Sequence, residues 1–433
     1  MKACVLTWGC QLNEHRSEEI AGVLAAAGYA LVAQPAEADV VILNTCMVRQ
    51  RAEDKAAGRV GELERLRRER PLVIGVGGCM PQGRRDAIFR ICPGADFAFG
   101  TARIAELPRL IERARRGERF AFLPDPDGVE ALPVLRRSRF QAYVTIAEGC
   151  SHACAYCVVP GVRGPLRSRP LAAVMDELQD LAMQGYQEVT LLGQNVDAYG
   201  RDLGGGMDFA RLLRAVARVP IPRIRFTSSH PAYMTEEAIA AIAEGDNICE
   251  HVHLAVQSGS DRVLRAMGRG YTRAQYLELV RRLRERIPSV NITTDVIVGF
   301  PGEEEADFRD TLSLIDEVRF GTVYVAAYSP RPGTRAAALP DSVPPAEKRR
   351  RLAEVLAVTR RIARELHRER IGATVEVLAE AYLSDKGLVM GKTRDFRTVL
   401  FPGDTSMIGK LVEVAVEGAT AGAMIGQVEE RGR

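Results

Sequence analysis

The chain has 433 residues, of which 46% are hydrophobic, so it can bury more than one core and is expected to form several globular domains. Its 59 Lys and Arg residues nearly balance 56 Asp and Glu residues, and a net charge of +3 is too small to identify a polyanionic partner by itself. The sequence contains no apolar run of about 18 residues and no signal-peptide pattern, which predicts a cytoplasmic protein without a membrane partner.

The first segment, residues 1 to 124, alternates short apolar strands with amphipathic helices. This alternation predicts a doubly wound parallel sheet with helices on both faces, and hence an α/β fold. The expected strands are ACVLTW at 3–8, ADVVILN at 38–44 and PLVIGVG at 71–77. Residues 125–139 have no clear period and are expected to be a linker.

The second segment, residues 140 to 343, repeats a strand and then a helix six times. This repeat predicts a partial (βα)6 barrel with its chemistry at the carboxyl ends of the strands. The expected strands lie at 142–147, 188–193, 223–228, 251–256, 292–299 and 322–328. A connecting helix is expected within 344–371, and Gly-interrupted strands over 372–433 predict a small β-barrel.

Three of the nine cysteines, Cys150, Cys154 and Cys157, lie together in EGCSHACAYCVVP directly after the first strand of the second segment. A structural zinc site normally has four Cys or His ligands, and His152 is the one local candidate for the fourth. In a 4Fe-4S cluster, three thiolates leave one iron free to bind a substrate or cofactor. The spacing therefore favours a cluster over a zinc knuckle or unpaired buried thiols.

Three further cysteines each follow an expected strand of the first segment: Cys10 in TWGC, Cys46 in NTC and Cys79 in GVGGC. Parallel strands bring their carboxyl ends to one edge of a sheet, so these residues are expected to meet and to hold a second cluster with one open iron. The glycines before Cys10 and Cys79 permit the close approach that such a site needs. Taken alone, the same pattern fits ordinary buried thiols, which is the role expected for the other cysteines, Cys4, Cys92 and Cys249.

The motif CSHACAYC is the CxxxCxxC signature of radical S-adenosylmethionine (SAM) enzymes. The segments LLGQNVDAYG, RIRFTSSHP, HLAVQSGSDRVLRAMGR, TDVIVGFPGE and AYSPRPGT resemble those of MiaB-type methylthiotransferases that act on tRNA, and the resemblance covers nearly the whole chain. The chain departs from the family pattern at Ala255, where proline is usual.

The resemblance implies two 4Fe-4S clusters and SAM as cofactors. Cys150, Cys154 and Cys157 would hold the cluster whose open iron chelates SAM and yields a 5'-deoxyadenosyl radical. In the family the N-terminal domain holds an auxiliary cluster whose open iron binds the transferred sulfur, which corresponds here to Cys10, Cys46 and Cys79. One SAM would methylate that sulfur, and a second would generate the radical that takes a hydrogen from the substrate.

Polar residues at the expected strand ends fit the binding of SAM. Their uncharged donors and acceptors can hold its methionyl and ribose groups, although each alone could be an ordinary strand-end cap. Tyr156 lies where relatives place an aromatic residue beside the adenine. The residues of this predicted rim are Gln194, Asn195, Ser228, Ser229, Gln257, Ser258 and Asp295.

The terminal segment resembles the TRAM domain, an RNA-binding module, most clearly in GKTRDFRTVLF. Cations and aromatic rings in this stretch are typical of single-stranded RNA sites. Outside this segment, Arg163 follows the cluster loop and could contact RNA phosphate, although a solvated charged loop explains this arginine equally well. The candidate residues of the terminal segment are Lys392, Arg394, Phe396, Arg397 and Phe401.

The expected activity is the radical-based methylthiolation of C2 of N6-isopentenyl-adenosine next to the anticodon of tRNA. Two related substrates stay open, threonylcarbamoyl-adenosine of tRNA and an aspartate of a ribosomal protein, and GQNV after the second barrel strand favours the first activity by resemblance. An iron-sulfur RNA-binding sensor without catalysis is the alternative from another class. The expected partners are the tRNA anticodon stem-loop, a sulfur donor and an electron donor such as flavodoxin or ferredoxin, and the chain is expected to be a monomer.

Overall fold

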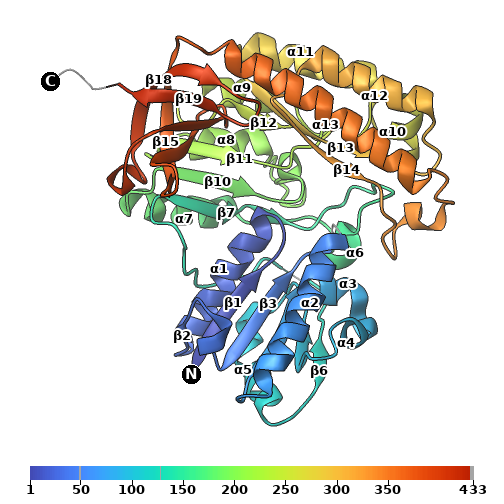
Figure 1. The fold of residues 1–433 in the computed structure, drawn as a ribbon, viewed down its shortest axis with the longest axis vertical. Coiled ribbons are helices and arrows are strands. Elements are labelled where there is room, and N and C mark those ends of the chain that lie inside the picture. Colours follow the sequence, from blue (N-terminus) through green and yellow to red (C-terminus); the bar gives the residue numbers. More distant parts are fainter. Residues whose placement is uncertain (48–49, 127, 430–433) are drawn as a thin grey trace.

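The structure, a computed structural model, describes residues 1–47, 50–126 and 128–429. An N-terminal α/β layer, a central α/β arc and a small C-terminal barrel follow one another along the chain (Figure 1). Within the described ranges, no helix has both the length and the apolarity needed to cross a membrane.

The N-terminal part is a six-stranded parallel sheet of order β2-β1-β3-β4-β5-β6. Apolar side chains from α1 and α5 cover one face of this sheet, and those from α2, α3 and α4 cover the other. The predicted doubly wound sheet is therefore confirmed. Its elements are β1 (Lys2–Thr7), α1 (Gln11–Ala26), β2 (Ala30–Leu31), β3 (Val40–Thr45), α2 (Gln50–Arg67), β4 (Val73–Gly78), α3 (Cys79–Arg84), α4 (Ile88–Ile91), β5 (Phe97–Phe99), α5 (Leu107–Arg115) and β6 (Phe120–Phe122).

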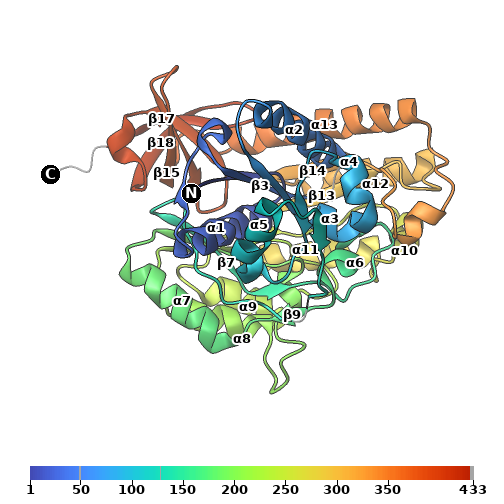
Figure 2. The same ribbon diagram turned by 90° about the horizontal axis from the view of Figure 1, so that it is seen from below.

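The central part is an open arc of six parallel strands in the order β7-β10-β11-β12-β13-β14. Two three-stranded sheets form it, joined by single bridges such as Ser229 with Leu254. Seen from below, the N-terminal layer lies across this arc, with α1 against β7 (Figure 2). The elements are β7 (Gln141–Thr145), β8 (Ala147–Glu148), α6 (Val159–Arg163), β9 (Arg167–Ser168), α7 (Leu171–Met183), β10 (Glu188–Leu192), α8 (Phe209–Val216), β11 (Arg223–Phe226), α9 (Glu236–Glu244), β12 (His251–His253), α10 (Asp261–Met267), α11 (Arg273–Arg286), β13 (Asn291–Val298), α12 (Glu305–Val318) and β14 (Thr322–Ala327).

The long helix α13 (Pro345–Arg368) packs against α12 and β14 and leads into a closed five-stranded barrel. The barrel strands are β15 (Thr374–Leu383), β16 (Leu388–Thr393), β17 (Thr398–Pro402), β18 (Leu411–Ala419) and β19 (Met424–Val428). The sequence patterns missed β19, and they also missed β2, β5 and β6, which have two or three residues each and show no period of their own. The short β11 and β12 were predicted because they belong to the strand–helix repeat.

Two arginines of β11 fasten the barrel to the arc. The fully buried Arg223 donates to the Glu376 carboxylate at 2.7 Å and to the Lys392 carbonyl at 2.8 Å. Arg225 donates to the Thr393 and Arg394 carbonyls, each at 2.7 Å. Guanidinium groups that bind backbone carbonyls fix the position of the turn after β16 relative to the arc.

The stretch expected to be a linker has no helix or strand in its described residues, yet it packs closely on α1. The Leu135 amide donates to the Glu18 carbonyl at 3.0 Å, and the Arg137 amide donates to the Glu18 carboxylate at 3.0 Å. A Cβ added at Gly22 would lie 2.1 Å from the Pro133 carbonyl oxygen, so this contact requires glycine.

Candidate functional site

Cys150, Cys154 and Cys157 lie in the loop between β8 and α6, at the carboxyl end of β7. The backbone amide of His152 lies 3.4 Å from the sulfur of Cys150, and the backbone amide of Val159 lies 3.4 Å from the sulfur of Cys157. Burial raises the pKa of the Cys157 thiol to about 12, whereas the neighbouring His152 and Arg269 side chains lower the pKa of Cys154 to about 7 against the effect of burial. Backbone amides that donate to thiolate sulfurs, as at Cys150 and Cys157, are typical of the surroundings of an iron-sulfur cluster.

His152 is the local candidate for a fourth ligand, since its ring, Cys154 and His230 bring ligand atoms within 4.8 Å of one another. Its Nε2 lies 3.0 Å from the Gly268 carbonyl, so this nitrogen must carry the proton and donate. Its Nδ1 lies 3.3 Å from the Tyr233 hydroxyl and accepts from it. Both ring nitrogens are therefore engaged, which argues against a zinc site that includes His152.

Cys10, Cys46 and Cys79 come together at the carboxyl edge of the N-terminal sheet. Their strands are neighbours in register, because Thr7 pairs with Asn44 and Thr45 pairs with Gly78. A Cβ added at Gly9 would lie 2.9 Å from the Cβ of Cys46. At Gly78, which has a φ of +95°, a Cβ would lie 2.6 Å from the Thr45 carbonyl oxygen. The two glycines thus permit the close approach expected from the sequence.

The two cysteine sets face each other across α6. Cys79 packs with Met47 against Val158 and Val162, and Val158 directly follows Cys157. The Thr101 hydroxyl adds a hydrogen bond of 3.0 Å to the Val162 carbonyl. The first turn of α6 therefore separates the two sets.

The predicted rim holds amide groups without partners. The side-chain oxygen and nitrogen of Gln194 and of Asn195 are buried and have no hydrogen-bond partner among the described residues. Leaving such a group unpaired costs about 1–3 kcal/mol, which a bound polar molecule would offset. SAM, with its amino, carboxyl and ribose groups, fits these amides, and the three cysteines of the CxxxCxxC loop fit a cluster with one open iron.

Two other rim residues have unusual backbone conformations. Ser228 and Gln257 follow β11 and β12 with φ values of +70° and +74°, a region that non-glycine residues rarely adopt and that is common at functional sites. Ser229 is buried, and the Asp295 carboxylate lies 3.1 Å from Nε2 of His253. Tyr156 packs on the apolar cluster around Phe300.

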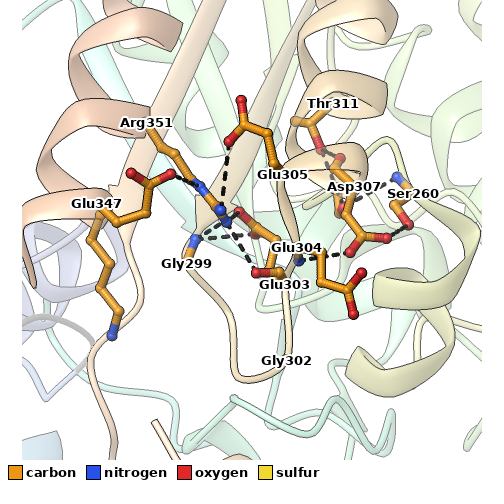
Figure 3. A network of polar contacts seen from close by, with 12 residues as sticks. Ser260, Gly299, Gly302, Glu303, Glu304, Glu305, Asp307, Thr311, Glu347 and Arg351 are labelled. Atoms are coloured by element: carbon orange, nitrogen blue, oxygen red, sulfur yellow. Dashed lines mark hydrogen bonds and ion pairs between the residues drawn. The ribbon is translucent and has the colours of Figure 1, made fainter. Parts of the chain in front are cut away.

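The loop that follows β13 is held by a buried ion pair (Figure 3). The Glu303 carboxylate accepts from the Gly299 amide at 3.0 Å and from Arg351 of α13 at 2.6 Å. Both side chains of this pair are at most 5% exposed. On the other side of the loop, Asp307 accepts from the Ser260 hydroxyl at 2.6 Å. These contacts tie the carboxyl ends of β12 and β13 to α12 and α13.

A cavity of about 1000 Å³ opens between the three parts of the chain. Cys10 and Cys46 lie on its N-terminal wall, and Ser228 and Asp295 of the rim line it as well. Other parts of its wall include polar residues inside the arc, Thr190, Arg225, His251, His253 and Thr293, and the barrel residues Glu380, Lys392 and Phe396. A substrate in this cavity would lie close to both the auxiliary cysteines and the rim.

Of the barrel residues predicted to contact RNA, some line the cavity and others are engaged elsewhere in the protein. Lys392 and Phe396 line the cavity, and the Phe396 ring stacks on His251 with centroids 4.7 Å apart. Arg394 instead pairs with Glu250 at 2.9 Å. These placements turn the motif inward, toward the arc.

Three of the predicted RNA contacts need correction. Arg394 is engaged in fastening the barrel to the arc, and Arg397, which is 9% exposed, pairs with Asp395 at 2.7 Å. Phe401 is fully buried in the barrel core, so it cannot stack on a base. Alternation along β17 points Phe401 into the barrel, whereas Arg394 and Arg397 lie in the turn between β16 and β17, where tertiary contacts decide their partners.

The prediction that Arg163 contacts RNA phosphate is also wrong, because its side chain is only 4% exposed. Its guanidinium donates to the Asn13 amide oxygen at 3.1 Å, at the contact between the N-terminal layer and the arc. Cys79, Glu148 and Cys10 raise the pKa of Arg163, although burial opposes them. Arg163 therefore belongs to the surroundings of the auxiliary cysteines.

Sequence reasoning missed the charged residues inside the arc. The segments Arg-Ile-Arg-Phe in β11 and His-Val-His in β12 alternate polar and apolar residues within strands that are buried on both faces. In a barrel, such alternation places polar side chains in the interior, and this was the signal available in the sequence. Arg269, described below, carries no comparable signal.

Comparison with protein families agrees with this division of the chain. Residues 144–315 match the Radical SAM superfamily, residues 2–100 match Uncharacterized protein family UPF0004, and residues 368–428 match the TRAM domain.

Similar curated proteins extend over the full length. A protein of Carboxydothermus hydrogenoformans named tRNA-2-methylthio-N(6)-dimethylallyladenosine synthase is 44% identical over 95% of this chain and 96% of its own. A protein of the same name from Moorella thermoacetica is 45% identical over 98% of this chain and 97% of its own.

Among solved structures, the radical S-adenosylmethionine methyltransferase TsrM of Kitasatospora setae, with cobalamin and a [4Fe-4S] cluster bound, has a TM-score of 0.58. It is 17% identical and covers 78% of this chain and 77% of its own, so this likeness bears on the fold alone. Family members use SAM and 4Fe-4S clusters. With two three-cysteine sites, a polar rim and full-length relatives at this level of identity, the chain belongs to the MiaB-type radical SAM tRNA methylthiotransferases.

Proposed function

We propose that this protein is a tRNA-2-methylthio-N6-dimethylallyladenosine synthase, which adds a methylthio group at C2 of N6-isopentenyl-adenosine next to the anticodon. The observation that carries the proposal is the pair of three-cysteine sites on either side of α6, together with a cavity of about 1000 Å³ that Cys10 and Cys46 of one site line. The full-length relatives that bear this name support the choice of substrate.

In this proposal Cys150, Cys154 and Cys157 hold the cluster that binds SAM. Bound there, SAM supplies the radical that abstracts a hydrogen from the substrate. The residues proposed to hold SAM are Tyr156, Gln194, Asn195, Ser229, Gln257 and Asp295. The buried, unpaired amides of Gln194 and Asn195 are the strongest support for this part.

Cys10, Cys46 and Cys79 hold the auxiliary cluster that carries the sulfur. Cys10 is exposed and lines the cavity, so a sulfur carried there can reach a substrate inside it. The target adenosine leaves its stack to enter the cavity, where Phe396 and His251 offer stacked rings and Lys392 offers a cation.

The tRNA anticodon stem-loop, a sulfur donor and an electron donor such as flavodoxin or ferredoxin are the proposed partners of a monomer in the cytoplasm. The proposed domains are 1–124 for the auxiliary cluster, 140–343 for SAM and 372–433 for RNA. Residues 125–139 join the first two, and 344–371 form the connecting helix.

The test is anaerobic reconstitution with iron and sulfide, followed by reaction with SAM, a reductant and tRNA that carries N6-isopentenyl-adenosine. About eight irons per chain are expected, as two 4Fe-4S clusters require, together with 2-methylthio nucleoside and 5'-deoxyadenosine by mass spectrometry. Methylthiolation of threonylcarbamoyl-adenosine alone, or of a ribosomal protein, would assign the enzyme to another branch of the methylthiotransferase family. Iron without 5'-deoxyadenosine indicates a sensor, and one tightly bound zinc without iron contradicts the proposal.

A further inference from the structure

Arg269 is a buried cation beside the cysteines of the CxxxCxxC loop. The residue is 3% exposed and directly follows Gly268, whose left-handed conformation ends α10. One guanidinium nitrogen, Nη1, lies 3.3 Å from the sulfur of Cys154 and 3.3 Å from the hydroxyl of Tyr156. The cation therefore points into the site formed by this loop.

The other nitrogens of Arg269 fix its orientation. Nε donates to the Tyr271 hydroxyl at 3.0 Å, and Nη2 donates to the Ala255 carbonyl at 2.5 Å. The Tyr271 hydroxyl also donates to the Val256 carbonyl at 2.7 Å. The guanidinium is thus held in place on the side away from the cysteines, at the position where the chain has alanine instead of the usual proline.

No carboxylate forms an ion pair with Arg269 in the described ranges of the chain, unlike the buried Arg225 and Arg351, which pair with Glu188 and Glu303. A buried cation without a counter-ion is strongly destabilising. Burial raises the pKa of the neighbouring Tyr156 and Tyr271 hydroxyls, which therefore stay neutral, so the sulfur of Cys154 at 3.3 Å is the contacting group that can supply negative charge.

We infer that Arg269 is a positioning residue for the cluster on Cys150, Cys154 and Cys157. The negative charge of this cluster is the counter-ion of Arg269, and Arg269 favours reduction of the cluster by a charge-assisted hydrogen bond to the Cys154 sulfur. This inference rests on the proposed function for the identity of these ligands. Reduction adds one negative charge to the cluster, and a nearby cation and a donor to sulfur stabilise the reduced form more than the oxidised form. Arg269 thus makes this cluster easier for its electron donor to reduce.

The experiment measures the midpoint potential of this cluster alone. A Cys10→Ala/Cys46→Ala/Cys79→Ala parent, reconstituted anaerobically without SAM, removes the auxiliary site, and EPR-monitored titration follows the remaining cluster. Arg269→Gln is expected to shift the midpoint to a more negative potential. A tenfold loss in the ratio of reduced to oxidised cluster at fixed potential would correspond to ~59 mV for one electron.

Two matched variants distinguish the effect of the Arg269 charge on the midpoint potential from a general effect on the fold. Arg269→Lys keeps the positive charge but loses the planar guanidinium with its several donors, so a smaller shift of the midpoint potential is expected. Arg265→Gln removes a charge from the exposed face of α10, close in sequence to Arg269, where solvent screens it, and is expected to leave the potential unchanged. An unchanged potential in Arg269→Gln with the cluster intact would overturn the inference, including the case in which the variant only weakens SAM binding.

A second measurement covers the case in which Arg269→Gln does not assemble a cluster. In the same parent labelled with 15N-arginine, pulsed EPR of the reduced cluster is expected to detect a guanidinium nitrogen that Arg269→Lys lacks. Equal couplings in the two proteins would overturn the inference. If the parent itself binds no iron, the proposed function fails instead, so the two failures are distinguishable.

Discussion

Substitution of Arg225 by methionine tests the coupling of the barrel to the arc. Arg225 pairs with Glu188 at 2.7 Å, with the two side chains 3% and 5% exposed, and donates to two carbonyls of the turn after β16. Methionine preserves the apolar stem but leaves the Glu188 carboxylate buried without its cation. Removal of one partner of a buried pair costs about 3–5 kcal/mol. The orphaned carbonyls could add about 1–3 kcal/mol each, but the adjoining cavity allows water to reach them, so we expect a total of about 3–5 kcal/mol.

The assay is urea unfolding together with hydrogen exchange of the turn after β16. Arg225→Met is expected to lower the unfolding free energy and to increase exchange at residues 393–397, because the turn loses its anchors. Arg225→Met/Glu188→Gln removes both charges and should recover at least ~1 kcal/mol in a double-mutant cycle. As a control, Arg214→Met breaks a pair whose side chains are 43% and 55% exposed and should change stability by less than ~1 kcal/mol. A loss of less than ~1 kcal/mol in Arg225→Met with unchanged exchange would refute the reasoning.

Four further outcomes are expected. Cys154→Ala should reduce bound iron from about eight to about four atoms per chain, because the auxiliary site remains; complete loss of iron would contradict two separate sites. Burial raises the pKa of Asp197 from 3.8 to about 7, so the folded state retains a proton that the unfolded state loses, and stability should fall as the pH rises from 3.8 toward 7 and then level off. Thermal unfolding of Asp197→Asn should lack this slope, and an identical pH profile would argue against the shift. Arg394→Ala should increase proteolysis of the barrel and leave the salt dependence of tRNA binding unchanged, whereas a shallower salt slope would restore the predicted phosphate contact. Arg351→Met should destabilise the protein by about 3–5 kcal/mol by leaving Glu303 buried and unpaired, and recovery in Arg351→Met/Glu303→Gln would confirm the cause.

The sequence determined the chemistry and the architecture of this protein. The spacing of Cys150, Cys154 and Cys157 is local, and one loop brings these residues together without tertiary information. Cys10, Cys46 and Cys79 lie far apart in the chain, yet their meeting was predictable because each follows a strand and parallel strands end at one edge. Periodicity was sufficient for the longer strands and for α13, but not for strands such as β5 and β6.

Only the tertiary structure decided which charged residues face which partner. Arg163 and Arg394 look like solvated cations in the sequence, but the packing of one domain on another buries the first and pairs the second. Arg269 is likewise indistinguishable from its exposed neighbour Arg265 until the fold places it 3.3 Å from the Cys154 sulfur. The physical reason is that local patterns set helices and strands, whereas the contacts of these three arginines join residues more than a hundred positions apart.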